Sequence, residues 1–137
     1  MKEPVWLEQE AVLLLHSISL ARFGGDEGMR DFGLLESALA RPRNLFAYDA
    51  AADRTDLAAA YAFGLIKDHA FVDGNKRIAL LAAGLFLEKN GITLDADSAD
   101  AISAVFALAA GSIGEKEFGA WLRANSSKPR SRKRRSP

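Results

Sequence analysis

Residues 69 to 77, His-Ala-Phe-Val-Asp-Gly-Asn-Lys-Arg, place a base, a carboxylate and two cations within one short stretch of the chain. The imidazole of His69 can accept a proton from a hydroxyl group near neutral pH. The carboxylate of Asp73 is a hard oxygen ligand, suited to the Mg²⁺ that accompanies a polyphosphate. A base close to a metal-binding carboxylate and to cations indicates group transfer from a nucleotide.

A buried helix is expected to begin directly after this stretch. Residues 78 to 87 are apolar on every side, and ten such residues are too short to span a bilayer, so we expect burial in a soluble core. Lys76 and Arg77 fall in the first turn, where each cation opposes the helix macrodipole by about 0.3–1 kcal/mol. Free backbone N–H groups also point outward there, and a bound phosphate would explain both features. The predicted phosphate site comprises Gly74, Asn75, Lys76 and Arg77.

The pattern His69-x-Phe71-x-Asp73-Gly74-Asn75-Lys76-Arg77 resembles the signature of the Fic/Doc (Fido) family, and specifically its Doc branch, the death-on-curing toxins of bacterial toxin–antitoxin pairs. Most Fic proteins have Pro where this chain has Ala70, and Gly where it has Lys76. Glycine lets backbone approach a phosphate closely, whereas a lysine side chain fills that space. Of the two departures, the one at Lys76 is therefore the one that bears on how the phosphates are bound.

The resemblance implies an activity and its cofactors. Most Fic proteins move AMP from ATP onto a protein hydroxyl, but in the Doc branch the lysine goes with a reversed nucleotide that presents its γ-phosphate. The resemblance thus implies a kinase that uses ATP and Mg²⁺, with His69 as the base and Asp73 as the metal ligand. Two alternatives stay open: an AMP transferase, and a catalytically inactive Fido module that only binds nucleotide or a partner.

The resemblance also implies partners. The target would be translation elongation factor Tu, whose phosphorylation would halt protein synthesis in the cytoplasm. A separate antitoxin would regulate the enzyme by folding its C-terminal segment into a groove on the toxin. No segment with the Ser/Thr-x-x-x-Glu pattern of the inhibitory Fic helix is found in the sequence.

The bulk composition fits one cytoplasmic domain, expected at residues 1 to 125. The chain has 137 residues, 49% of them hydrophobic, and no cysteine, which excludes disulfides and thiolate chemistry. Acidic residues interrupt the N-terminal apolar run, so no signal peptide or membrane association is expected. The net charge of zero conceals six Lys and Arg and no acid in residues 128 to 137. We expect residues 126 to 137 to be a disordered basic tail, either merely solvated or weakly attached to RNA, ribosomes or an acidic partner.

The hydrophobic periodicity predicts an all-α fold, a compact bundle of about six helices around a central buried helix at about residues 76 to 90, with little or no strand. The other helices are expected at residues 4 to 23, 32 to 40, 56 to 69 and 98 to 110, and after Glu115 with Phe118, Trp121 and Leu122 inward. The inward face predicted for the first helix comprises Leu7, Ala11, Leu14, Leu15, Ile18 and Ala21.

Two residues and one loop of these segments carry specific expectations. His16 lies on the flank of the first helix, where a solvated or core-edge histidine is expected rather than a ligand. Phe71 is expected to be a core plug that fixes the loop. Residues 24 to 31 read as a loop that is either a structural turn or a rim of the site for the acceptor protein.

Pro42 is expected to end the second helix and to begin a loop from residue 41 to residue 54. The resemblance places this segment near the mouth of the pocket, where Fic proteins hold a target segment in extended form. Phe46 and Tyr48 would then line the path of the target. Alternatively, they anchor the loop to the core.

Overall fold

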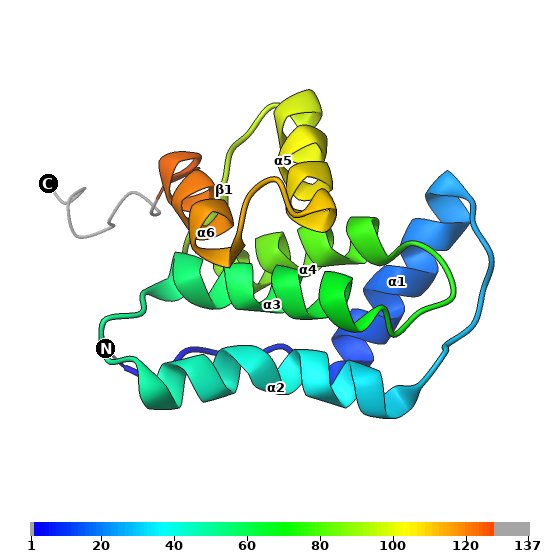
Figure 1. Ribbon diagram of the computed structural model, residues 1–137, viewed down its shortest axis with the longest axis horizontal. Helices are drawn as coiled ribbons and strands as arrows, with labels where there is room; N and C mark the ends of the chain where they lie inside the picture. The colour runs from blue at the N-terminus through cyan, green and yellow to red at the C-terminus, as the bar shows by residue number, and fades with distance from the viewer. Residues whose placement is uncertain (1, 128–137) are drawn as a thin grey trace, which may run out of the picture.

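The computed structural model of the protein describes residues 2 to 127, and this part of the chain forms six α-helices and one pair of two-residue strands (Figure 1). The prediction of an all-α bundle is confirmed. The elements in chain order are α1 (Gln9–Phe23), α2 (Phe32–Tyr48), α3 (Arg54–Asp68), α4 (Asn75–Lys89), β1 (Thr93–Leu94), α5 (Ser98–Ala110), α6 (Glu115–Ala124) and β2 (Ser126–Ser127).

Helix α4 is the central element, as its composition predicts. It packs against α3, α1 and α5, and α3 packs in turn against α2 and α6. Its buried residues are Asn75, Ile78, Ala79, Ala82, Ala83, Phe86 and Leu87. Alanines on both α3 and α4 allow the two backbones to approach closely. Burial is not complete all round, because Leu81 remains 37% exposed.

Helix α1 differs from the prediction in where it begins and in which face it buries. It starts at Gln9, because the preceding segment is extended and Asn90 hydrogen-bonds both the N–H and the carbonyl of Val5, at 2.8 and 3.0 Å. The predicted inward face is wrong in part: Leu7 is buried and Leu15 packs against the core, but Leu14 is 61% and Ile18 51% exposed. The residues of α1 that are buried are instead Val12, His16, Ser19 and Leu20.

Helix α2 continues through Pro42 to Tyr48, so the predicted stop and the predicted loop from residue 41 are wrong. Proline has no N–H, and the Ala38 carbonyl therefore loses its helical hydrogen bond. Gly64 of α3 lies against this point, where a Cβ would come within 3.0 Å of the Ala38 oxygen. Close packing of α2 on α3 thus stabilises a helix that the local sequence disfavours.

The described chain extends slightly beyond the predicted end of the domain. Ser126 and Ser127 pair antiparallel with Leu94 and Thr93, and the Asp95 N–H donates to the Asn125 carbonyl at 2.7 Å. The predicted disordered tail therefore cannot begin at residue 126. Its remaining residues, 128 to 137, lie outside the part of the chain that the structure describes.

Candidate active site

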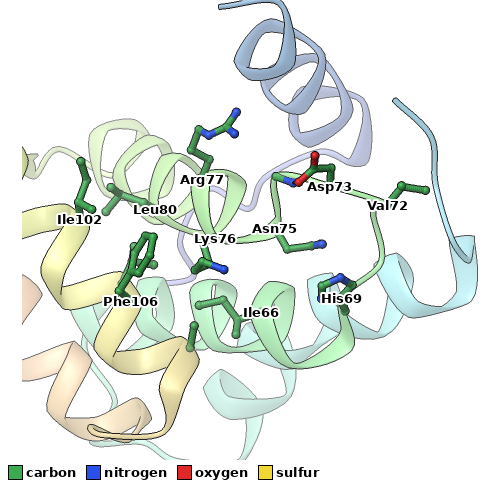
Figure 2. A pocket seen from close by; sticks show the side chains of 13 residues that line it. Ile66, His69, Val72, Asp73, Asn75, Lys76, Arg77, Leu80, Ile102 and Phe106 are labelled. Atoms are coloured by element: carbon green, nitrogen blue, oxygen red, sulfur yellow. The ribbon is translucent and has the colours of Figure 1, made fainter. Parts of the chain in front are cut away.

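The loop of residues 69 to 74 joins α3 to α4 and borders a cavity of about 390 Å³ (Figure 2). An N-terminal capping box formed by Asp53 and Asp56 starts α3, and His69 ends it in the left-handed conformation. Four elements supply the lining: the end of α3, the loop, the first turns of α4, and α5. The lining residues are Ile66, His69, Val72, Asp73, Gly74, Asn75, Lys76, Arg77, Leu80, Ile102, Val105, Phe106 and Ala109.

The N-terminus of α4 opens into this cavity and has the features of an anion site. The first backbone N–H groups of any helix have no helical acceptor. Gly74, which precedes α4 with φ 79°, has no side chain that could cap them. Lys76 extends over the ring of Phe106, with its Nζ 5.2 Å from the ring centroid. Free N–H groups and a cation at one cavity wall suit a phosphate.

Asn75 and Arg77 line the cavity but are also committed to the scaffold. The Asn75 side chain accepts from the Phe71 N–H at 3.2 Å and donates to the Phe71 carbonyl at 2.9 Å, and it is buried. Arg77 Nη1 donates to the Ser19 carbonyl at 3.4 Å and to the Gly24 carbonyl at 3.2 Å. In Figure 2 the Arg77 side chain points away from Lys76 and towards α1. At Asn75, therefore, the backbone N–H rather than the side chain can face a phosphate.

The Asp73 carboxylate is held by two backbone N–H groups. Oδ2 accepts from Asp26 at 3.1 Å and Oδ1 accepts from Gly74 at 2.8 Å. These hydrogen bonds, first that of Asp26 and then that of Gly74, lower the pKa of Asp73, and Arg77 adds to the effect. The carboxylate is therefore ionised at neutral pH and keeps free lone pairs.

The donor set fits Mg²⁺ that is held mainly by a nucleotide. Within residues 2 to 127, no group of three His, Cys, Asp or Glu residues is arranged to hold a metal ion. Mg²⁺ is commonly bound through one or two carboxylates together with substrate phosphates and waters. Asp73 can supply that single carboxylate beside the N-terminus of α4.

His16 supports this site without lining the cavity, and the sequence did not reveal that role. It is only 5% exposed, its Nε2 donates to the Asp73 carbonyl at 2.7 Å, and its ring stacks on Phe71 with centroids 3.7 Å apart. Phe71 is 2% exposed, as the predicted core plug requires. The sequence contains one sign of the role of His16. Val12, His16 and Ser19 are spaced by four and three residues, so they share one face of α1, and this is the buried face.

The glycine-rich loop of residues 24 to 31 runs beside the loop of residues 69 to 74 and is hydrogen-bonded to it. Met29 and Phe71 form an antiparallel bridge. The Arg30 N–H donates to the Ala70 carbonyl at 2.7 Å, and the Val72 N–H donates to the Gly28 carbonyl at 3.0 Å. These backbone contacts support the structural-turn interpretation; no residue from 24 to 31 lines the cavity, and the rim of an acceptor-protein site stays a prediction.

The two aromatic residues predicted to dock a target lie elsewhere. Phe46 and Tyr48 are in the last turns of α2, at the end of the α2–α3 pair opposite His69 (Figure 1). Neither lines the cavity. Phe46 packs edge-on against Trp6, with ring centroids 5.7 Å apart, whereas Tyr48 is 90% exposed.

Comparison with known proteins supports what this geometry indicates. The model of the Fic/DOC family matches residues 6 to 87, which is more than half of the chain. This protein belongs to the Fic/DOC family. A protein named Toxin Doc, from Mycolicibacterium smegmatis, is 46% identical over 93 residues, which cover 67% of this chain and 69% of that protein. Protein kinase doc of Escherichia phage P1 is 36% identical over 86 residues, covering 63% of this chain and 68% of the phage protein.

The region shared with the Fic/DOC family contains α1, α2, α3 and nearly all of α4, and hence every residue from His69 to Arg77. Helix α5 lies outside the matched region, although it supplies Ile102, Val105 and Phe106 to the cavity. None of the described helices is long and apolar enough to cross a membrane.

Proposed function

We propose that this Fic/DOC-family protein is the toxin of a bacterial toxin–antitoxin pair and transfers the γ-phosphoryl group of ATP to a Ser or Thr hydroxyl of a protein. One observation carries the proposal: His69 and the uncapped N-terminus of α4, with Lys76, border the same cavity. The names of the two relatives, a toxin and a protein kinase, support it.

Each group has a distinct part in the proposed reaction. The hydroxyl oxygen of the target forms a bond to the γ-phosphorus, the bond from that phosphorus to the bridging oxygen breaks, and ADP leaves. His69 accepts the hydroxyl proton. The N–H groups at the start of α4, together with Lys76, stabilise the charge on the transferred group, and Arg77 would join them by turning from the Ser19 and Gly24 carbonyls towards the nucleotide. Bound Mg²⁺ would neutralise phosphate charge, with Asp73 as its protein ligand.

The proposed target is translation elongation factor Tu, as the resemblance to the Doc branch implies. Its modification would arrest translation, so expression of this protein alone would stop growth. The Fic/DOC fold by itself does not select the target, which rests on that analogy.

We propose that the antitoxin binds a second groove, on the side of α4 towards α1, β1 and α5. This groove of about 460 Å³ is lined by Leu15, Leu80, Leu81, Gly84, Leu85, Glu88, Thr93, Leu94, Ala96 and Ala101. The exposed Leu14 and Ile18 of α1 add apolar surface on the neighbouring helix. A groove with these apolar walls suits the apolar face of an amphipathic segment.

ATP labelled in parallel reactions at the α- or the γ-phosphate tests the reaction, with purified elongation factor Tu and with cell extract as acceptors. Transfer of γ-label alone is expected. Transfer of α-label would replace the kinase with an AMP transferase, and ATP binding without any transfer would indicate an inactive binding module. His69→Ala should abolish transfer and preserve the helical circular dichroism signal, whereas full activity of this variant would remove the histidine from the mechanism.

A further inference from the structure

His69 has an uncommon backbone conformation for the base of an active site. Its φ of 50° and ψ of 53° lie in the left-handed region, and it is the one residue other than glycine with positive φ in residues 2 to 127. For a residue with a Cβ this conformation costs roughly 1–2 kcal/mol, so the surroundings must maintain it. The conformation also sets the direction in which the imidazole leaves the backbone.

Three backbone hydrogen bonds fix the peptides that follow His69. The Ala70 carbonyl accepts from Arg30 at 2.7 Å and from Asp31 at 3.4 Å, and the Val72 N–H donates to the Gly28 carbonyl at 3.0 Å. None of these bonds reaches the peptide of His69 itself. They therefore hold the loop but leave the rotation of the His69 carbonyl undetermined.

The side chain of Arg30 supplies the missing constraint. Its Nη1 donates to the His69 carbonyl at 2.6 Å. This oxygen stands at the C-terminal end of α3, where a cation is favoured by the helix dipole and can satisfy a carbonyl that has no helical donor. Arg30 is exposed and is not among the residues that line the cavity, so it has no contact with the expected nucleotide site.

We propose that Arg30 is the positioning residue of the catalytic base: it holds the His69 carbonyl so that His69 keeps its left-handed conformation and its imidazole faces the phosphate site. This inference rests on the proposed function for its catalytic consequence. Without Arg30, the chain between α3 and the Ala70 carbonyl can relax to a conformation of lower backbone energy. The imidazole would then point away from the acceptor hydroxyl while the nucleotide site stays complete.

The test compares Arg30→Ala with Arg30→Lys and with a control, Arg22→Ala. Arg22→Ala makes the same change in net charge, and the contact that the Arg22 guanidinium makes within residues 2 to 127 is with the ring of Phe23, 5.8 Å from the centroid. Arg30→Ala should lower kcat for label transfer by roughly 10- to 100-fold and leave KM for ATP within about twofold, because misplacement of a catalytic group reduces the rate without reducing nucleotide affinity. Arg30→Lys, which retains a donor and the charge, should recover part of the rate. Arg22→Ala should behave as the wild type.

A second measurement is independent of activity. The backbone φ of His69, obtained by NMR from chemical shifts and residual dipolar couplings, should be positive in the wild type and in Arg22→Ala, and should change sign or become averaged in Arg30→Ala. Urea denaturation of each variant shows whether it is folded. If Arg30→Ala fails to fold, the proposal is tested with Arg30→Lys alone. A lower kcat at constant KM for ATP would support the positioning role, and an unchanged kcat would contradict it.

The outcomes separate this inference from the proposed function. A wild-type protein that transfers no label while the φ of His69 depends on Arg30 would refute the proposed function and retain the positioning role. An active wild type whose Arg30→Ala variant keeps its kcat, or loses activity only through KM, would overturn the positioning role. An unchanged φ in a folded Arg30→Ala variant would overturn it as well.

Discussion

His16 and Arg30 hold the active-site loop from two sides, although neither belongs to the motif of residues 69 to 77. His16 donates to the Asp73 carbonyl from α1, and Arg30 donates to the His69 carbonyl from the glycine-rich loop. The motif residues could be predicted as a cluster because they are contiguous and stand at one loop–helix junction. Their supports could not, because 57 and 39 residues separate the partners in these two hydrogen bonds.

Replacing His16 with leucine tests its support of the loop. Leucine is apolar and of similar bulk, so His16→Leu leaves the Asp73 carbonyl without its donor. An unsatisfied buried acceptor costs about 1–3 kcal/mol, and we expect the free energy of unfolding to fall by that amount in urea denaturation. Transfer activity should fall too, because Asp73 and Gly74 shift. Ser17→Ala, at the exposed neighbouring position, is the control. If Ser17→Ala and His16→Leu had the same free energy of unfolding, the hydrogen bond of His16 would not contribute to stability.

At the level of elements, helix boundaries followed the sequence where local and tertiary preferences agree. The span of α4 was predicted within one residue at each end, because its apolar run and its Asn90-Gly91 stop coincide with its burial. The extent of α2 could not be predicted, because the packing of Ala38 against Gly64 overrides the local effect of Pro42. The inward face of α1 was missed for a similar reason. The buried His16 and Ser19 of α1 find polar partners in the loop before α4 and in α4 itself, and these partners are distant in the sequence.

Two glycine substitutions test the packing of α2 on α3. Gly64→Ala places a Cβ within 3.0 Å of the Ala38 oxygen and 3.2 Å of its Cα, so we expect a loss of about 1–3 kcal/mol in the free energy of unfolding. Gly84→Ala in α4 is the matched control, since a Cβ there meets only Leu94 Cδ2, at 4.0 Å. This variant should gain up to about 1 kcal/mol from helix propensity. Equal urea midpoints for the two variants would contradict the close approach.

The N-terminus of α3 should make stability depend on acid pH. Partial burial raises the pKa of Asp53, but hydrogen bonds from Thr55, from the Asp56 N–H and from Arg123, together with the Arg123 charge, lower it from 3.8 to about 2. Because the folded pKa is the lower one, this stabilisation is complete above pH of about 4 and is lost as the pH falls towards about 2. Solvent screening of the exposed ion pair reduces the effect to about 1 kcal/mol.

Asp53→Asn keeps a good capping residue and removes the ionisation. Thermal unfolding between pH 4 and pH 2 should therefore depend less on pH in this variant than in the wild type. Asp95→Asn, which changes an exposed aspartate after β1, should keep the wild-type slope. If Asp53→Asn and the wild type lost stability in parallel over this range, the lowered pKa would not contribute to folding.

At the scale of the whole molecule, α4 separates two surfaces with different chemistry. Its N-terminal end borders the cavity that contains His69 and Lys76, whereas its middle and C-terminal part border the apolar groove with Leu81 and Leu85. Both surfaces depend on α5, which contributes Ile102 to the cavity and Ala101 to the groove. An antitoxin bound in the groove as proposed would therefore act on the proposed nucleotide site through α4 and α5 without entering it.

This arrangement predicts that toxicity and neutralisation can be separated by mutation. Leu81 is 37% exposed in the groove and does not line the cavity, so a charge there should oppose an apolar segment without affecting catalysis. Expressed alone, Leu81→Glu should arrest growth as the wild type does. Co-expression with the small protein encoded beside the toxin gene should rescue the wild type but not this variant, because burying an unpaired carboxylate is costly.

Ser103→Glu, on the exposed side of α5, is the matched control and should be rescued. Full rescue of Leu81→Glu would place the antitoxin on another surface, whereas loss of growth arrest in this variant would mean that the groove and the catalytic cavity do not function independently.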